Sequence, residues 1–558
     1  MEKTKKIRRK YTLFTGKQLL WLILPIVIEQ IFSTSLGLFD SMMVSNMPGD
    51  SSNAGLAVSN VDYVNNLIIQ LFSAFATGGA IITSQYLGAQ ENENANKSAK
   101  QMLVLVVLLS VGIAGLCLAL NWPLLKLFYG EVPPSAFGYQ QIYFYVTAAS
   151  FPFIGLFNAC AALLRVQRKS LFTMISAAIS CVLNVGLNAV FLFVAKMGVL
   201  GAGLATLICR AIPAIFMLVM LANRKNAVCV RIFEKFRFDG KMLKKILKLA
   251  IPSGIESCLF QLGKLMTSTF VNVGCYVQPV LDANGAPVLD AAGNATYINV
   301  QANGNSIANQ INNIASVVGS GVGTSCLTVI GQAVGTGDAD QVKYYMKKMF
   351  VLSYIANAIF AGIILICVPW LVKLYGYTAD AQQIGKNCLY FCLAFQFVTY
   401  PLSFTTPAIL KATSDVRYVM YSAVISMIVM RVGLCFLMTT DKIPNLPKLG
   451  AFGYWIGMCS DWVMRSVLFL SRLLSGRWKR ASGLIKEPAA AAAEGGDGQA
   501  ESAEGQPEEQ LPESVADGAE NGAAEAEENR DGDASVSQSA EEPESAENDA
   551  TDGEKEDK

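Results

Sequence analysis

Two carboxylates stand inside an apolar stretch near the start of the chain, LPIVIEQIFSTSLGLFDSMMV at residues 24–44. Glu29 and Asp40 are eleven residues apart, which on a continuous helix corresponds to three turns plus about 20°. Both acids therefore share one face of the expected helix, about 16 Å apart along its axis. Because a carboxylate inside a bilayer costs several kcal/mol, such residues mark functional sites by default.

The chemistry open to an acid in these surroundings is the binding of a small cation. Desolvation in a low-dielectric cavity favours the protonated form of a carboxylate, so binding of a proton or Na⁺ becomes a switch at neutral pH. The chain has no histidine, so any proton carrier inside the membrane must be a carboxylate. The alternative for Asp40 is a structural pair with a basic residue in the membrane.

The composition is that of a polytopic membrane protein. Of 558 residues, 53% are hydrophobic and only 16% are charged, which is too apolar for a soluble protein of this length. The thirteen cysteines stand singly in apolar segments and form neither a disulfide framework nor a metal motif. From about residue 487 the chain is acidic and without aromatic residues, and we expect it to be disordered. This tail either solubilises the protein or contacts its basic cytoplasmic face.

Apolar windows long enough to cross a bilayer predict twelve transmembrane helices. They begin near Leu19, Ala54, Gln101, Tyr139, Leu171, Gly201, Ile246, Ser306, Phe350, Asn387, Tyr418 and Ala451. With the N-terminus in the cytoplasm, the inner loops carry most of the Lys and Arg, above all in the segment at 224–248. The positive-inside rule therefore predicts a multi-pass protein of the inner cell membrane with both termini in the cytoplasm.

The two sets of six spans repeat each other in sequence. TSQYLGAQENENANKSAKQM at 83–102 aligns with VIGQAVGTGDADQVKYYMKKM at 329–349. The aligned pairs include Gln85 with Gln332, Gly88 with Gly335, Pro25 with Pro252, and Glu29 with Glu256. Because six is an even number, both halves enter the membrane in the same sense, which predicts two lobes related by a pseudo-twofold axis along the membrane normal.

The expected organisation is an all-α membrane protein with five parts. These are a basic cytoplasmic N-terminus at 1–17, an N-lobe at 18–223, a basic inter-lobe loop at 224–242, a C-lobe at 243–475 and a cytoplasmic tail at 476–558. The outer loop at 275–303 carries a doubled PVLDA and the turn signals DANG and AAGN. This pattern predicts a small external hairpin.

Several motifs recur in order across the twelve spans. They are PIVIEQIFSTSLGLFDSMMVS, SQYLGAQENENAN, LLRVQRKS, LNVGLNAVFLF, GVLGAGLATL, IGQAVGTGDADQ and ILKATSDVR. In this order the chain resembles the multidrug and toxic compound extrusion (MATE) transporters over residues of about 10 to 475. The resemblance implies two six-helix lobes in a V, alternating access driven by inward flux of Na⁺ or H⁺, and organic cations, dyes and drugs as substrates.

The resemblance also implies a cation-coupling site in the N-lobe. Asp40 matches the family's acid on the first span, Asn184 matches its fifth-span Asn, and Thr206 fits its sixth-span hydroxyl. Asn188 stands where relatives carry an Asp, so one carboxylate is expected instead of two, and the ion stays open between Na⁺ and H⁺. Oxygen ligands of this kind suit a hard cation such as Na⁺. The alternative for the Asn pair is interhelical hydrogen bonding.

Further residues are expected to support the site or line the cavity. They are Glu29, Gln70, Glu256, Gln261, Lys264 and Tyr400. Lys264 either lines the cavity or snorkels to the interface. The other basic residues of the membrane are few and scattered along the sequence, and Asp461 and Arg465 are spaced to pair within one helix.

The sequence therefore predicts a secondary active antiporter that exports organic cations or drugs in exchange for Na⁺ or H⁺. It predicts a monomer in the lipid bilayer, with no cofactor besides the ion, no nucleic-acid partner and no enzymatic activity. The alternatives are a lipid-linked oligosaccharide flippase of the same superfamily, for which an Arg-rich cavity is expected, and a receptor or scaffold that transports nothing.

Overall fold

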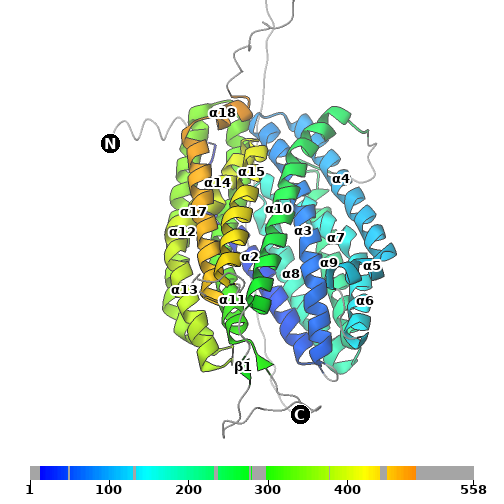
Figure 1. Ribbon diagram of the computed structural model, residues 1–558. Helices are drawn as coiled ribbons and strands as arrows, with labels where there is room; N and C mark the ends of the chain where they lie inside the picture. Colours follow the sequence, from blue (N-terminus) through cyan, green and yellow to red (C-terminus); the bar gives the residue numbers. More distant parts are fainter. Residues whose placement is uncertain are drawn as a thin grey trace, which may run out of the picture. The chain divides into compact units, whose positions relative to one another are not determined.

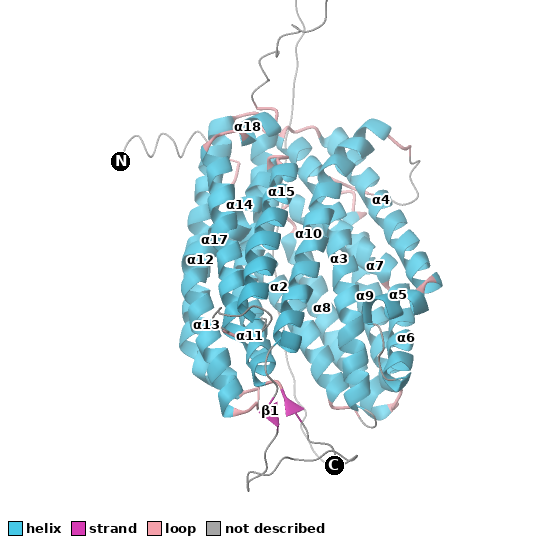
Figure 2. Ribbon diagram, viewed as in Figure 1, coloured by secondary structure: helices cyan, strands magenta, loops and turns pink. Residues whose placement is uncertain are grey.

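The computed structural model describes residues 13–47, 51–129, 134–230, 237–274, 278–279, 297–375, 377–439 and 449–484. The helices described belong to one compact unit, Met1–Pro488, and are drawn in Figure 2. The acidic tail, the first twelve residues and the turn of the predicted outer hairpin lie outside the described residues. Of that hairpin the structure gives two short antiparallel strands, β1 (Gln278–Pro279) and β2 (Tyr297–Ile298).

The helices of the first half follow one another with short connections. They are α2 (Gly16–Ser45), α3 (Ser51–Gly88), α4 (Asn92–Ala119), α5 (Asn121–Tyr129), α6 (Pro134–Ala149), α7 (Phe151–Val166), α8 (Ser170–Asn188) with a π-helical extension at Ala189–Val194, and α9 (Gly198–Leu221). Between α6 and α7 the chain bends by 44°, and Pro152 lies in the first turn of α7, where its missing N–H costs no helical hydrogen bond.

The second half repeats this order. Its helices are α10 (Gly240–Gly274), α11 (Val300–Gly335), α12 (Ala339–Lys373), α13 (Ala379–Tyr400), α14 (Thr406–Ala412), α15 (Val416–Ser426), α16 (Cys435–Thr439), α17 (Ala451–Leu474) and α18 (Trp478–Ala481). π-Helical segments at Pro401–Thr405 and Met427–Leu434 join α13 to α14 and α15 to α16. Two six-helix lobes result, and Figure 1 shows the C-terminal lobe in green to orange beside the N-terminal lobe in blue to cyan.

Within the described residues, the joined helices form the twelve long segments that the sequence predicts. Nine of them are long and apolar enough to cross a membrane, and the bent α6–α7 pair makes a tenth. The other two are α10, which contains Glu256 and Lys264, and α17, which contains Asp461 and Arg465. Both are less apolar because they contain these charged residues.

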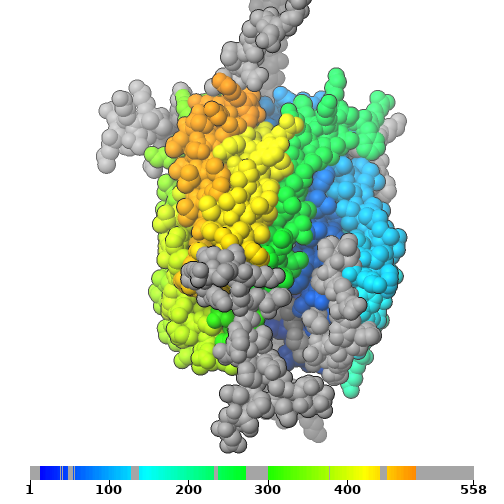
Figure 3. Space-filling view, in the orientation of Figure 1, coloured from blue at the N-terminus to red at the C-terminus, as the bar shows by residue number. Residues whose placement is uncertain are grey.

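The lobes contact each other through α2, α3, α10 and α11. Figure 3 shows the green surface of α10 directly beside the blue surface of α3. The closest approaches use small residues on this contact. A Cβ atom at Gly78 would lie 2.8 Å from the backbone of Ala250, and one at Gly321 would lie 2.8 Å from the side chain of Val27. The four inter-lobe helices therefore pack backbone to backbone, as small residues permit in membranes.

The repeated Gln-x-x-Gly motif forms a reciprocal contact between the lobes, here named the glutamine junction (Gln85, Gly88, Gln332 and Gly335). The Gln85 side chain donates to the carbonyl oxygen of Ala412 over 3.0 Å, and the Gln332 side chain donates to that of Val166 over 2.7 Å. Each glutamine therefore bonds to the last residue of a helix in the opposite lobe, α14 or α7, and the two bonds are related by the repeat.

The two glycines of the junction are required by close approach. A Cβ atom at Gly88 would lie 2.0 Å from the carbonyl oxygen of Gln332, and one at Gly335 would lie 2.0 Å from that of Gln85. Arg168 strengthens one side, since its Nη2 donates to Gln332 Oε1 over 2.7 Å. The ends of α3 and α11 thus close the molecule at this end.

Candidate functional site

Asp40 lies in the interior of the N-lobe, where it is hydrogen-bonded to Asn188, which in turn contacts Asn184. Its carboxylate is buried on α2, and Asn188 Nδ2 donates to Asp40 Oδ1 over 2.6 Å. The same amide nitrogen lies 3.4 Å from Asn184 Oδ1, one turn earlier on α8. The π-helical extension begins directly after Asn188, and such insertions frequently occur at functional sites. The structure therefore brings these three residues together.

Two buried oxygens next to this group have no hydrogen-bond partner among the described residues. They are Asn188 Oδ1 and Thr206 Oγ1; Thr206 is 3% exposed on α9, which packs against α8. Unsatisfied buried oxygens are costly and require an explanation. A hard monovalent cation that binds oxygen ligands would satisfy them, and so would a water.

A second carboxylate, Asp62, which the sequence analysis did not consider, lies near Asp40. The hydroxyl oxygen of Tyr143 on α6 lies 3.5 Å from Asp40 Oδ2 and 3.4 Å from Asp62 Oδ1. Asp62 is on α3, and Asn65 Nδ2 donates to it over 3.3 Å. A tyrosine hydroxyl has one proton to donate, so it can satisfy only one of the two acids at a time.

The sequence prediction did not include Asp62 or Tyr143. The signal for Asp62 was present, because it is an ionisable residue inside the second predicted span, as Asp40 is in the first. Tyr143 gives no such signal, since aromatic residues in membrane helices mostly pack or anchor.

One guanidinium acts on both acids. Arg210 on α9 forms no ion pair with Asp40 or Asp62 in the described part of the chain, and its Nη1 donates to Ser150 Oγ over 2.8 Å. Its positive charge nevertheless lies near enough to attract both carboxylates. With both acids ionised, the three side chains carry one net negative charge. A single proton or Na⁺ would make the group neutral, which is the favoured state of a buried charge cluster.

Exposed polar side chains follow one face of α3 beside this group. Ser59, Tyr63, Asn66 and Gln70 are exposed, and their spacing of three to four residues places them on one stripe. On α11, Asn313 and Ser320 are exposed as well. Polar groups inside a span face water or protein instead of lipid, so these inter-lobe helices border a hydrated surface. The cavity-lining role of Gln70 stays a prediction.

Glu29 and Glu256 form equivalent ion pairs in the two lobes. Glu29 binds the guanidinium of Arg165, and the Thr173 hydroxyl donates to it over 2.6 Å. Glu256 binds Lys411 Nζ over 2.7 Å. Each pair connects the first helix of a lobe to the end of its fourth. This geometry is suited to supporting the packing of these two helices.

The remaining predicted side chains occupy different surroundings in the C-lobe. Gln261 is half-buried and Lys264 is exposed, both on α10. Tyr400 is 3% exposed, donates to Ser316 O over 3.0 Å and stacks on Phe404. Tyr400 therefore packs in the core of this lobe, and the supporting or cavity-lining roles of these three residues stay predictions.

The basic residues of the C-lobe are not scattered in space, contrary to the expectation from the sequence. Arg431, Arg465 and Lys264 surround the ring of Phe260, with charged groups 4.9, 4.9 and 5.2 Å from its centroid. We name these four residues, together with Asp461, the Phe260 cluster. Asp461 pairs with Arg465 within α17, as expected, and also with Arg431 over 3.1 Å.

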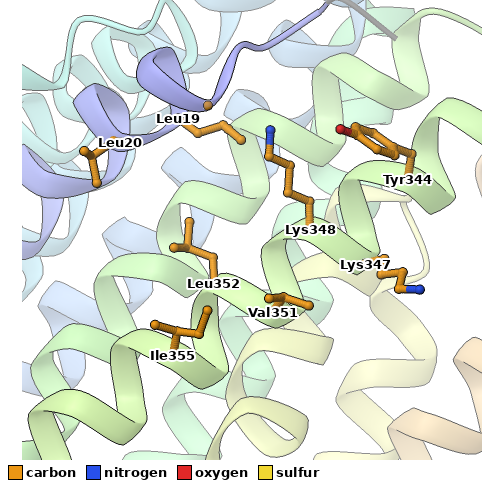
Figure 4. Close-up of a pocket in the computed structure, with 9 residues that line it drawn as sticks. Leu19, Leu20, Tyr344, Lys347, Lys348, Val351, Leu352 and Ile355 are labelled. Carbon is orange, nitrogen blue, oxygen red and sulfur yellow. The ribbon is translucent and has the colours of Figure 1, made fainter. Parts of the chain in front are cut away.

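A hollow of about 470 Å³ lies elsewhere, between the start of α2 and α12. Figure 4 shows its lining, with apolar residues such as Leu352 and Ile355 and the lysines Lys347 and Lys348. It contains none of the predicted site residues. The charged centres that bear on function are therefore the Asp40 group and the Phe260 cluster, which lie inside the two lobes.

The fold consists of two six-helix lobes that contact each other through the glutamine junction, and the N-lobe contains a buried acid group. These features define a membrane transporter built from a repeated helical bundle. The sequence profile of the MatE family matches residues 25–190 and 303–437, one stretch in each half and more than half of the chain. The chain belongs to this family of multidrug efflux transporters.

Relatives and solved structures agree with this assignment. The chain is 24% identical to the "Probable multidrug resistance protein NorM" of Thermotoga maritima over 84% of this chain and 95% of that protein. It is 26% identical to the "Uncharacterized transporter YisQ" of Bacillus subtilis over 81% and 93%. Two solved structures share the fold at 21% identity, covering 84% of this chain and 96% of each. They are a MATE protein "in complex with MaL6", with a TM-score of 0.71, and the "outward-facing conformation" of a multidrug resistance MATE transporter, with 0.70.

Proposed function

We propose that this protein is a secondary active exporter of organic compounds, coupled to inward movement of H⁺ or Na⁺ at the Asp40–Asp62 pair. The observation that carries the proposal is the shared hydroxyl. Tyr143 has one proton for two carboxylates, so the group is incomplete until a cation binds. Asn184, Asn188 and Thr206 supply the further oxygens that a hard cation needs.

The net charge of the Asp40 group is matched by one monovalent ion. Two carboxylates and Arg210 carry one net negative charge, so one monovalent cation neutralises them. Two ionised acids in contact with the same hydroxyl repel each other, and the cation removes this repulsion. Binding of the ion therefore stabilises one arrangement of α2, α3 and α6 relative to another. Alternating access needs this difference in ion affinity between the two states.

The glutamine junction supports the direction of access. We propose that this end of the molecule faces the cytoplasm, in the inner membrane of the cell and with both termini inside, since the positive-inside rule favours that orientation of the basic loops. The junction is closed, while polar stripes on α3 and α11 are exposed. We therefore interpret the structure as the outward-facing state, from which substrate leaves and into which the ion enters.

The compounds exported are organic molecules, and the Asp40–Asp62 pair inside the N-lobe attracts those that are cationic. The protein performs transport and not catalysis, and we propose that it acts as a monomer, since each chain contains both lobes and the complete Asp40 group. Glu29 and Glu256 serve as supports for the first helix of each lobe.

The test is dye accumulation in everted membrane vesicles under an imposed H⁺ or Na⁺ gradient. A fluorescent organic cation should accumulate with wild type under one of the two gradients, and Asp40→Asn should abolish the gradient dependence. Glu93→Gln is the matched control, because Glu93 is an exposed carboxylate whose ion pair with Lys97 lies on the surface. Gradient-driven accumulation that survives in a well-inserted Asp40→Asn protein would remove Asp40 from the coupling mechanism.

A further inference from the structure

The Phe260 cluster has more positive charge than its partners neutralise. Arg431, Arg465 and Lys264 contribute three positive charges, and Asp461 contributes one negative charge that both arginines share. Glu256 lies near enough to act on Arg465, but it is paired with Lys411. The cluster therefore carries an excess of two positive charges inside a membrane-spanning lobe.

Part of this charge has no partner. Arg431 is 1% exposed, and its Nη1 has no hydrogen-bond acceptor among the described residues. Lys264 Nζ has no carboxylate partner in the described part of the chain, where the ring of Phe260 is the contact that it makes. A buried guanidinium nitrogen without an acceptor costs several kcal/mol. The arrangement of these donors is therefore suited to binding an anion.

Lys264 gives this site an opening. On α10, Ile251, Ile255, Leu262 and Met266 are exposed apolar residues and form the face suited to lipid. Lys264 is nine residues from Ile255, which is about 180° around a helix. Because Lys264 is exposed and points away from that face, it borders the hydrated side of α10 and does not snorkel along lipid.

We propose that the Phe260 cluster binds an acidic group, a carboxylate, sulfonate or phosphate, of the transported organic compound, with Lys264 as the accessible contact and Arg431 behind it. This inference deepens the proposed transport function and rests on it for the transport step after binding. Compounds that carry both an amine and an acid would then match both lobes, the acid on the Phe260 cluster and the amine toward the N-lobe carboxylates.

A small organic acid fits the cluster better than a lipid diphosphate. An excess of two positive charges, with Arg465 held by Asp461, is suited to one acidic group and falls short of a diphosphate. The accessible contact also lies on the face of α10 opposite the lipid-facing residues, whereas a lipid carrier would approach from the bilayer.

The test is equilibrium binding to the purified full-length protein in nanodiscs, without any ion gradient. The probes are rhodamine B, which carries a free carboxylate, and its ethyl ester, which has the same cationic core without the acid. We expect wild type to bind the acid about tenfold more tightly than the ester, as one charged hydrogen bond predicts. Lys264→Gln should remove this preference and Lys264→Arg should keep it.

Controls separate this inference from the proposed function. Lys347→Gln removes an exposed lysine of α12 far along the chain and should keep the preference for the acid. Equal binding of acid and ester by wild type, or an unchanged preference in Lys264→Gln, would overturn the site. If wild type prefers the acid to the ester but shows no gradient-driven transport in vesicles, the binding site stands and the exporter function is overturned. If farnesyl diphosphate binds in a Lys264-dependent way and rhodamine B does not, the assignment to small organic acids is overturned in favour of a lipid carrier.

Discussion

The two lobes share a scaffold and differ in the charge at their centres. Both hold the first helix with an ion pair to the end of the fourth, Glu29 with Arg165 and Glu256 with Lys411. In the N-lobe centre, two acids face one arginine, whereas in the C-lobe centre three basic residues face one acid. The two halves of the repeat thus share the ion pairs that connect their helices and differ in the sign of the charge at their centres.

The largest effect is expected from removing the one acid of the Phe260 cluster. Asp461→Asn leaves Arg431 and Arg465, which are 1% and 5% exposed, without their counter-charge. Breaking a buried ion pair in this way costs about 3–5 kcal/mol. Thermal unfolding of the purified protein should show a large loss of stability, while Asp340→Asn, at an exposed pair with Lys343, should show almost none. Equal stability of the two variants would mean that the arginines have another acceptor.

The two supporting ion pairs should differ in strength although they occupy equivalent places. Glu29 is 3% exposed in its pair and also accepts from Thr173, while Glu256 is 14% exposed. Glu29→Gln should therefore cost about 3 kcal/mol and Glu256→Gln about 1 kcal/mol. Unfolding midpoints of both variants in one detergent measure the difference, and a larger loss at Glu256 would contradict it.

The glutamine junction should respond equally to substitution in either lobe. Gly88→Ala and Gly335→Ala each place a Cβ about 2 Å from a carbonyl oxygen of the opposite lobe and should destabilise the closed junction by about 1–3 kcal/mol. Hydrogen exchange of residues 84–90 and 331–337 should increase in both variants. Gly112→Ala is the control, since nothing lies within 4 Å of its Cβ position. Strongly unequal responses would show that the junction is not symmetric in energy.

The smallest effect is expected at Asp62. Asp62→Asn leaves Asp40 and Arg210 as a neutral pair, so the group attracts a cation less strongly. The concentration of the coupling ion needed for half-maximal efflux should rise about tenfold, the size of one lost charge interaction in a partly buried site. An ion dependence identical to that of wild type would exclude Asp62 from the coupling group.

The sequence predicted the lobes well because helix length, loop charge and the repeat are local or periodic signals. The repeat even identified the residues of the glutamine junction, since Gln85 and Gln332 stand at the same offset as Gly88 and Gly335. It could not show that they contact each other. That contact joins residues about 250 positions apart and depends on how two packed bundles meet.

The charged centres were harder to predict for the same reason. Asp40 was found as a carboxylate within an apolar span and the asparagines through a resemblance, whereas Asp62, Tyr143 and Arg210 come from three other helices and meet only in the folded lobe. The Phe260 cluster likewise combines α10, α15–α16 and α17, so Lys264, Arg431 and Arg465 looked unrelated along the chain. The packing of Tyr400 against Phe404 could not be predicted, because an aromatic side chain in a helix gives no signal of which neighbour covers it.

The reciprocal glutamine junction makes one polypeptide behave at this end like a symmetric dimer. In an isologous interface each contact occurs twice, so the bond from Gln85 to Ala412 has a twin from Gln332 to Val166. The two bonds are separately encoded, unlike those of a true homodimer, so a mutation alters one of them and leaves the other intact. Evolution can therefore adjust the stability of the closed state in half-steps, which a protein made of identical subunits cannot do.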